Sequence, residues 1–172
     1  MLKRLLLSMA VLAASIVSAA ADTAKEILDP YVGTWTGQIQ VTDSTGNLRQ
    51  TIKGTHTFAW DKKNNVLRGT HVFEAGGKTN SAESETGIFK GELVRKMIYK
   101  DKEPTLLKGV WKDKRLTWIP AAVWEATKYQ IIEYVEVKDK KRTLVIQRVE
   151  LTSERSGVPT GLRFDGRFQP AK

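Results

Sequence analysis

The sequence predicts an all-β fold: a closed antiparallel up-and-down barrel of about 8–10 strands, with a short N-terminal helix, after a cleaved signal peptide. Short β-prone runs recur about every eight to twelve residues, which is the spacing of sandwiches and barrels. The segments between them are short and rich in Gly, Asn and Asp, so they join antiparallel neighbours. Closure is expected because an open sheet of so many strands would leave two long unpaired edges.

Residues 1–21 have the layout of a secretory signal peptide. Lys3 and Arg4 precede an apolar run over residues 5–17, and small residues end the segment. The run has about thirteen residues, fewer than the roughly 20 that cross a bilayer, which favours cleavage over an uncleaved membrane anchor. We therefore expect a periplasmic or secreted protein.

The mature part, residues 22–172, is predicted to be one lipocalin-like barrel domain, with no linker that divides it. The chain has no cysteine, which excludes disulfides, thiolate zinc sites, thiol catalysis and a lipoprotein anchor. The net charge of +9 falls to +7 without the leader, which carries two basic residues and no acidic one. This charge serves solubility and also favours peripheral contact with anionic envelope surfaces. We expect no nucleic-acid partner, because the protein is exported and its basic residues are scattered.

The elements follow in order from turn chemistry and β-propensity. Residues 22–29 predict a short helix that Pro30 ends. Ten candidate strands come after it, at 34–41, 50–60, 66–74, 82–90, 93–100, 106–111, 115–119, 128–137, 143–151 and 162–169.

Alternation along the first three strands and the last one separates an inward from an outward face. The inward set is Trp35, Gly37, Ile39, Val41, Ile52, Gly54, His56, Phe58, Trp60, Leu67, Gly69, His71, Phe73, Leu162, Phe164, Gly166 and Phe168. The middle strands are apolar on both faces, as at Val94 and Ile98 and over residues 144–149. Such strands predict an outer surface that is covered by the N-terminal arm or by a partner subunit.

Glycine occurs repeatedly on the inward face. These positions are Gly37, Gly54, Gly69 and Gly166. They indicate either strand bends at barrel corners or space for a ligand. In the second case the inward aromatic side chains would form the apolar wall of a small-molecule pocket.

Both histidines occur in a Gly-Thr-His triplet, in adjacent strands. With residues 63–64 at the tip of a tight hairpin, residues whose numbers sum to 127 are opposite each other. His56 then faces His71 with Cβ atoms about 5 Å apart. Two inward imidazoles are most often hydrogen-bonded to Thr, Ser or water, and a weaker hypothesis is a metal or haem site completed by Glu83 or Glu85.

The segment 30–37 places Gly33 and Trp35 at the start of the first strand, just after a helical segment. It resembles the signature of the calycin superfamily, which includes lipocalins, fatty-acid-binding proteins and nitrobindin-like barrels. The mature chain is also similar to the uncharacterised lipocalin-like domains of exported bacterial proteins. In calycins this tryptophan lies at the closed end and packs against a basic residue of a late strand. The resemblance therefore implies Arg163 or Arg167 as the partner of Trp35.

Arg95 shares a strand face with Tyr99 and with apolar neighbours. If this face is inward, the buried guanidinium needs an anion. Fatty-acid-binding proteins hold a ligand carboxylate with an interior arginine and a tyrosine, so the resemblance implies this role for Arg95 with Tyr99 or Tyr129. The alternative is an outward Arg95 paired with Glu85 or Glu133, and the sequence leaves both open.

The chain contains no nucleophile elbow, zinc-protease motif or phosphate-binding glycine loop, so we expect no enzyme activity. We also expect no cofactor. Nitrobindin-like barrels hold haem through a histidine near the C-terminus, and no histidine follows His71 in this chain.

The functional prediction is an exported barrel that binds a small, mainly apolar ligand in its interior, with an anionic ligand as one option. The candidate ligand-binding residues are His56, Phe58, Trp60, His71, Phe73, Arg95, Tyr99 and Phe164. One alternative is a filled barrel that works through its surface, as an envelope protein-interaction or stress factor. The other is metal or haem binding through the histidine pair.

Overall fold

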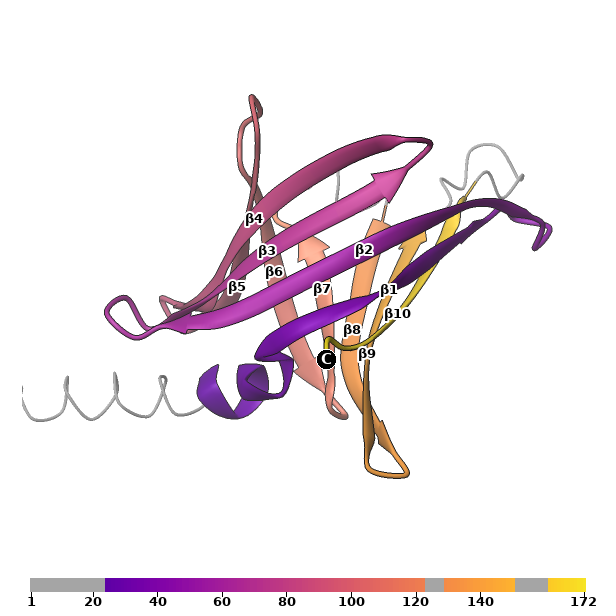
Figure 1. Cartoon of the computed structure of the whole chain (residues 1–172). Coiled ribbons are helices and arrows are strands. Elements are labelled where there is room, and N and C mark those ends of the chain that lie inside the picture. The colour runs from indigo at the N-terminus through magenta and orange to yellow at the C-terminus, as the bar shows by residue number, and fades with distance from the viewer. Residues whose placement is uncertain (1–23, 123–128, 151–160) are drawn as a thin grey trace, which may run out of the picture.

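A computed structural model describes residues 24–122, 129–150 and 161–172, and these residues form a closed antiparallel barrel (Figure 1). The ten strands described are β1 (Gly33–Thr42), β2 (Leu48–Asp61), β3 (Val66–Ala75), β4 (Lys78–Phe89), β5 (Glu92–Tyr99), β6 (Thr105–Lys112), β7 (Arg115–Pro120), β8 (Tyr129–Lys138), β9 (Lys141–Glu150) and β10 (Arg163–Pro170). Each strand pairs with its neighbours in sequence, and β1 pairs with β10 to close the barrel. The predicted fold class, an up-and-down barrel, is confirmed.

A short helical segment packs against one end of the barrel, beside the start of β1 (Figure 1). Residues 24–28 are α-helical and continue into a 3₁₀ turn, η1 (Asp29–Tyr31). Pro30 lies inside this turn and does not end the helical path, because the first turn of a helix needs no N–H from that position. Leu28 and Tyr31 are buried and join the hydrophobic core of the barrel.

The predicted signal peptide, residues 1–21, lies outside the described residues, and so does the first part of the predicted helix. Among the described residues, no helix has the length and apolar character that crossing a membrane requires. The boundary between leader and mature domain stays a prediction.

Two-residue turns set the register of several hairpins. Gly76 and Gly77 have φ values of 56° and 75°, which only glycine adopts at low cost, and they form a tight turn that pairs Ala75 with Lys78. The ladder therefore begins at Lys78, four residues before the strand start predicted at 82. Positive φ values also mark the turns at Lys90-Gly91, Asp113-Lys114 and Asp139-Lys140.

The hairpin between β2 and β3 has the register predicted from the sequence. Asp61 pairs with Val66 across the turn, and His56 therefore pairs with His71. The Asp61 carboxylate accepts backbone hydrogen bonds from Lys63 and Asn64 and holds the turn in shape. The side-chain amide of Asn64 also donates to this carboxylate, and this bond, together with the backbone bonds, lowers the pKa of Asp61.

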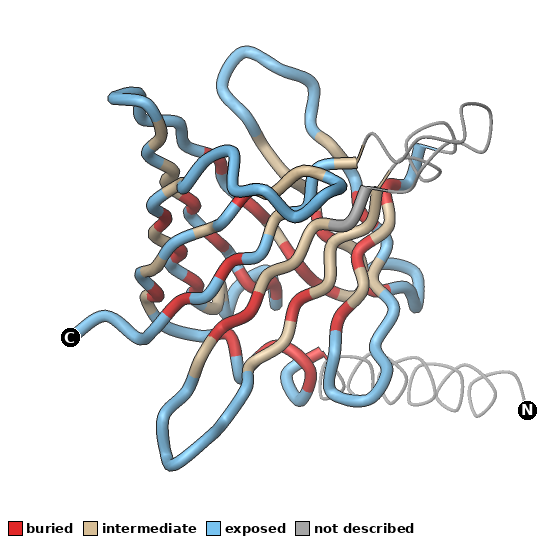
Figure 2. The backbone as a smooth tube through the Cα atoms, turned by 90° about the vertical axis from the view of Figure 1, so that its right-hand side faces the viewer, coloured by how far each residue is buried: buried red, intermediate tan, exposed pale blue. Residues whose placement is uncertain are grey.

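Buried and exposed residues alternate along much of the barrel wall (Figure 2). The core comprises Ile27, Leu28, Tyr31, Trp35, Phe58, Leu67, Leu93, Leu107, Leu116, Trp118, Leu144 and Phe168. On the outer face of β6, Leu106 and Val110 are 48 % and 51 % exposed. The predicted cover rested on Val94 and Ile98, which are half-buried, and on residues 144–149, of which Val145 is buried. The described N-terminal residues pack at the barrel end, and cover of the outer surface by the N-terminal arm stays a prediction. A partner subunit on this surface also stays a prediction.

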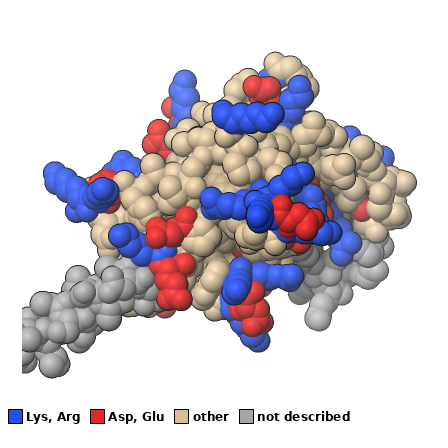
Figure 3. Space-filling model, turned by 60° about the horizontal axis from the view of Figure 1, so that its bottom comes forward, with Lys and Arg blue, Asp and Glu red and all other residues tan. Residues whose placement is uncertain are grey.

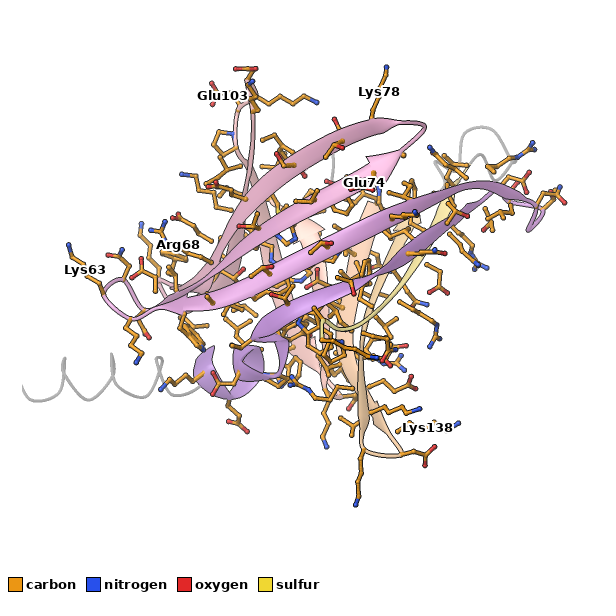
Figure 4. All side chains as sticks on the ribbon, in the orientation of Figure 1. Lys63, Arg68, Glu74, Lys78, Glu103 and Lys138 are labelled. Atoms are coloured by element: carbon orange, nitrogen blue, oxygen red, sulfur yellow. The ribbon has the colours of Figure 1, made fainter. Side chains whose placement is uncertain are left out.

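Charged side chains of both signs are scattered over the outer surface and the hairpin tips. Figure 4 shows Lys63, Lys78, Glu103 and Lys138 at hairpins, pointing away from the barrel. On the face drawn in Figure 3, basic and acidic groups lie close to one another. Arg68, for example, reaches a carboxylate of its own strand pair, with an N–O distance of 3.0 Å to Asp61.

The inward glycines make room for neighbouring protein groups. A β-carbon at Gly54 or at Gly166 would lie 2.8 Å from opposite edges of the Phe168 ring, which is fully buried between them. A β-carbon at Gly69 would overlap the hydroxyl of Ser84. The interpretation that these glycines leave space for a ligand is therefore wrong, because side chains of the core occupy that space.

Gly37→Ala is expected to destabilise the barrel by roughly 1–3 kcal/mol, the usual cost of overpacking. A β-carbon there would overlap the backbone oxygen of Arg167 and lie 2.7 Å from the Cα of Phe168, so β1 and β10 would have to separate. Gly87→Ala is the control, because its β-carbon would meet a side-chain methyl of Val66 at 3.1 Å. Urea unfolding should show a clearly larger loss for Gly37→Ala, and equal losses would contradict this explanation.

Candidate ligand cavity

The barrel interior contains a cavity of about 180 Å³ with a mainly apolar wall. Seven strands, β1, β2, β3, β5, β6, β8 and β9, contribute to it. The lining residues are Ile39, His56, His71, Phe73, Arg95, Met97, Tyr99, Thr105, Leu107, Tyr129, Ile131, Glu133, Ile146 and Arg148. An apolar wall with a few convergent polar groups is typical of small-molecule sites. A hollow of about 330 Å³ on the outer face has walls that are about half polar, with Thr36, Lys53 and Glu74 among the lining residues, and it lacks this apolar character.

Hydrogen bonds tie the helical segment to β1 and β8 of the barrel. The Trp35 Nε1–H donates to the carbonyl oxygen of Tyr31 at 2.7 Å. The Tyr31 hydroxyl donates to the carbonyl oxygen of Glu133 at 3.1 Å. Burial raises the pKa of Tyr31, so the phenol stays protonated and remains a donor. Glu133, whose side chain lines the cavity, is thereby linked to the N-terminal segment.

A buried ion pair forms part of the cavity wall. Arg95 Nη1 donates to Glu133 Oε1 at 2.6 Å, and the two side chains are 3 % and 6 % exposed. Trp118 Nε1 donates to the other carboxylate oxygen at 2.8 Å, and Arg95 Nε donates to Thr86 Oγ1 at 3.0 Å. The guanidinium also lies 4.2 Å from the ring centroid of Trp118. Arg95 Nη2 is buried and makes no hydrogen bond within the described part of the chain.

The histidine pair forms a hydrogen-bonded chain beside this ion pair. The Nδ1 atoms of His56 and His71 are 2.8 Å apart, and His71 Nε2 lies 2.9 Å from Ser84 Oγ. This series of hydrogen bonds ends at His56 Nε2, which is buried and has no hydrogen-bond partner among the described residues. The Phe58, Phe73 and Phe168 rings surround His56.

Both imidazoles are neutral at pH 7. Burial is the main cause that lowers the pKa of His56 to about 4. Burial also holds the pKa of His71 well below its usual value, and the neighbouring His56 and Arg95 add to this effect. Because a hydrogen bond joins the two Nδ1 atoms, one of them carries a proton and the other accepts it. The protons of the histidine pair therefore have two possible arrangements. In one of them His56 Nε2 is a donor, and in the other it is an acceptor.

This geometry does not favour a metal between the two rings, because their Nδ1 atoms share a hydrogen bond. The expectation that Glu83 or Glu85 completes a site is wrong. Glu83 is exposed, and Glu85 is half-buried on the outside, where it pairs with Arg68 at 3.3 Å. Among the described residues, no group of three or more His, Asp or Glu side chains could hold a metal ion.

The structure brings together five of the eight predicted ligand-binding residues. His56, His71, Phe73, Arg95 and Tyr99 line the cavity. The other three lie elsewhere. Phe58 is in the core, Trp60 donates from Nε1 to Asp29 Oδ1 at 2.6 Å, and Phe164 lies under the Arg148 guanidinium at 5.4 Å. Strand alternation gave their inward direction but not their depth along the barrel axis.

Glu133 is the polar residue of the cavity whose position the sequence left open. Arg95 faces inward, as the ligand-binding hypothesis predicted. Its partner is Glu133, which the alternative hypothesis had placed with Arg95 on the outside. The sequence of β8 could have indicated this position, because Glu133 lies between Ile131 and Val135 on the inward face of the strand. A carboxylate on an apolar face indicates an interior basic partner.

The predicted basic partner of Trp35 is wrong. Arg163 and Arg167 are exposed, and they pair with Thr42 and Gln38, so their side chains project from the outer face of β10. The guanidinium that lies over the Trp35 ring, 5.0 Å from its centroid, belongs to Arg142 of β9. Arg142 also donates to the backbone oxygen of Pro30 and so ties η1 to β9.

No protein-family model matches the chain, and no curated protein matches it. Nine chains of solved structures do match. One is an S-type phycobiliprotein lyase, CPES, from Guillardia theta, with 9 % sequence identity and a TM-score of 0.47, over 90 % of this chain and 97 % of that chain.

Proposed function

We propose that this protein is an exported barrel that binds a small, mainly apolar ligand in its interior cavity. Two buried polar atoms carry the proposal. Arg95 Nη2 and His56 Nε2 belong to residues that line the same cavity, and neither makes a hydrogen bond within the described part of the chain. An unsatisfied buried polar group costs about 1–3 kcal/mol. A ligand with one polar end would satisfy both atoms and place its apolar part against the rest of the wall.

The cavity volume limits the size of the ligand. Common small-molecule sites have volumes of about 300–1,000 Å³, and this cavity has about 180 Å³. An apolar cavity of about 150 Å³ is large enough for benzene. The ligand is therefore a compound with one ring or a short chain.

Filling the cavity is expected to weaken ligand binding at least tenfold while leaving the fold intact. Ile131→Phe adds volume to the inner wall of β8, whereas Ile132→Phe adds the same volume to the outer face of the same strand. Titration of wild-type protein with benzene, followed by methyl NMR shifts of Ile39 and Met97, should show saturable binding. We expect at least a tenfold loss of affinity for Ile131→Phe, equal to about 1.4 kcal/mol, and no change for Ile132→Phe.

Native mass spectrometry of protein from its exported compartment gives a second test. A bound mass that leaves on denaturation would support the proposal. If wild-type protein carries no ligand and benzene shifts no cavity methyl group, the barrel does not work through its interior.

A further inference from the structure

We propose that the cavity takes a small monocarboxylic acid together with one proton, as a carboxylate held between Arg95 and a singly protonated His56–His71 pair. The inference rests on the proposed interior binding and specifies the head group of the ligand. No covalent step is involved. The proton comes from solvent and returns to solvent when the ligand leaves.

Arg95 Nη2 and His56 Nε2 together determine which head group fits. Arg95 Nη2 can only donate, and His56 Nε2 can donate or accept. A carboxylate presents two acceptor oxygens on one carbon, so it would pair with both atoms when His56 Nε2 carries a proton. A carboxamide of the same shape would pair with them when His56 Nε2 is an acceptor. These two head groups therefore require different proton arrangements in the histidine chain.

The histidine chain can gain a proton without moving any heavy atom. When it is neutral, one proton lies between the Nδ1 atoms, 2.8 Å apart, and a second lies at His71 Nε2 or at His56 Nε2. When it is singly protonated, the Nδ1 contact is unchanged, and both Nε2 atoms carry protons. His71 Nε2–H then donates to Ser84, and His56 Nε2–H donates toward the cavity. The charge is shared by two rings.

The charges around His56 favour uptake of that proton with an anion. Arg95 of β5 and Glu133 of β8 neutralise each other, and the groups from β2, β4 and β10 in contact with the pair are uncharged. A carboxylate alone would add an uncompensated buried charge, which is costly. Protonation of the histidine pair cancels it. Without a ligand the low pKa of both imidazoles keeps the pair neutral, so the proton arrives with the anion.

Arg148 is the competing cation. It also lines the cavity, and its guanidinium lies 4.2 Å from the Tyr129 ring centroid. In the β8–β9 ladder Arg148 is opposite Ile131, whereas Glu133 is opposite Ile146, so the Cα of Arg148 lies about 7 Å farther than that of Glu133 from the end where the helical segment packs. Tyr99, whose side chain also lines the cavity, is 38 % exposed. If Arg148 compensated the carboxylate, no proton would be taken up.

The test is calorimetric titration of wild-type protein with benzoate and with benzamide, in two buffers of different ionisation enthalpy. We expect uptake of about one proton per benzoate and none per benzamide. Benzoate affinity should fall about tenfold per pH unit between pH 6 and pH 8, and benzamide affinity should stay constant. The variant His56→Asn/His71→Asn should lose the proton uptake and bind benzoate at least tenfold more weakly, whereas its loss of benzamide affinity should be smaller and should not depend on pH.

The outcomes separate this inference from the function on which it rests. Benzoate binding without proton uptake, or benzamide binding without benzoate binding, would overturn the inference and leave interior ligand binding in place. Binding of neither compound, together with no benzene binding, would overturn both. Because the benzoate–benzamide comparison needs only wild-type protein, the test does not depend on the folding of the variant.

Discussion

Glu133→Gln is expected to lower the free energy of unfolding by about 3–5 kcal/mol, the usual cost of breaking a buried ion pair. The substitution keeps the shape of the side chain and an oxygen that can accept from Trp118. It removes the negative charge 2.6 Å from Arg95. The guanidinium, 3 % exposed, is then buried without a counter-ion, and arginine does not lose its proton in proteins. Most of the lost free energy of unfolding therefore comes from the uncompensated charge of Arg95, and less of it comes from the lost hydrogen bond.

A double-mutant cycle isolates the free-energy cost of leaving Arg95 without its counter-ion. Urea unfolding at pH 7 would compare wild type, Glu133→Gln, Arg95→Met and the double variant. Replacing both charges by neutral groups is often nearly neutral in stability, so Arg95→Met should recover most of the loss when Glu133 is already Gln. Losses that simply add would contradict a coupled pair.

The same strand offers a matched control. Glu136 pairs with Arg167 at 3.6 Å, and their side chains are 48 % and 60 % exposed. Exposed ion pairs contribute about 0–1 kcal/mol. Glu136→Gln should therefore change the free energy of unfolding by less than 1 kcal/mol. A similar loss for Glu133→Gln and Glu136→Gln would show that burial does not set the cost.

The sequence allowed the local parts of the site to be predicted, because local chemistry determines them. The turn after Asp61 fixes which residues of β2 and β3 are opposite, and this places His56 against His71. Strand alternation likewise gave the inward direction of Arg95. Both inferences depend on residues close in the chain, where turn geometry and the two-residue period of a strand are sufficient.

The contacts across the barrel could not be predicted in this way. Arg95 and Glu133 are on strands that do not pair with each other, and strand tilt and stagger decide whether they meet. The same holds for Arg142, which is far from Trp35 in the sequence yet lies over its ring. Alternation fixes the face of a side chain and says nothing about its height along the barrel axis, which is why Phe58 is in the core and not on the cavity wall.

The histidine pair is expected to make the fold sensitive to acid. Burial lowers the pKa of His56 from 6.5 to about 4 in the folded protein. Below pH 6.5 the unfolded chain binds a proton at this residue and the folded chain does not, so the free energy of unfolding falls as the pH falls. This loss is about 3 kcal/mol between pH 7 and pH 4. His71, whose pKa is also lowered, increases it.

Urea unfolding of wild type and His56→Asn/His71→Asn at pH 7, 5.5 and 4.5 measures this contribution. Carboxylates such as Asp43 and Asp61, whose pKa values are lowered in the fold, destabilise both proteins equally as they are protonated. The difference between the two proteins therefore belongs to the histidines. We expect the variant to be less stable at pH 7, where it lacks the native hydrogen-bonded chain, and to lose less stability on acidification. Parallel pH profiles would mean that the imidazoles gain protons in the folded state as readily as in the unfolded chain. In that case the pair would be charged without a ligand below about pH 6.5, and anion binding there would require no further proton.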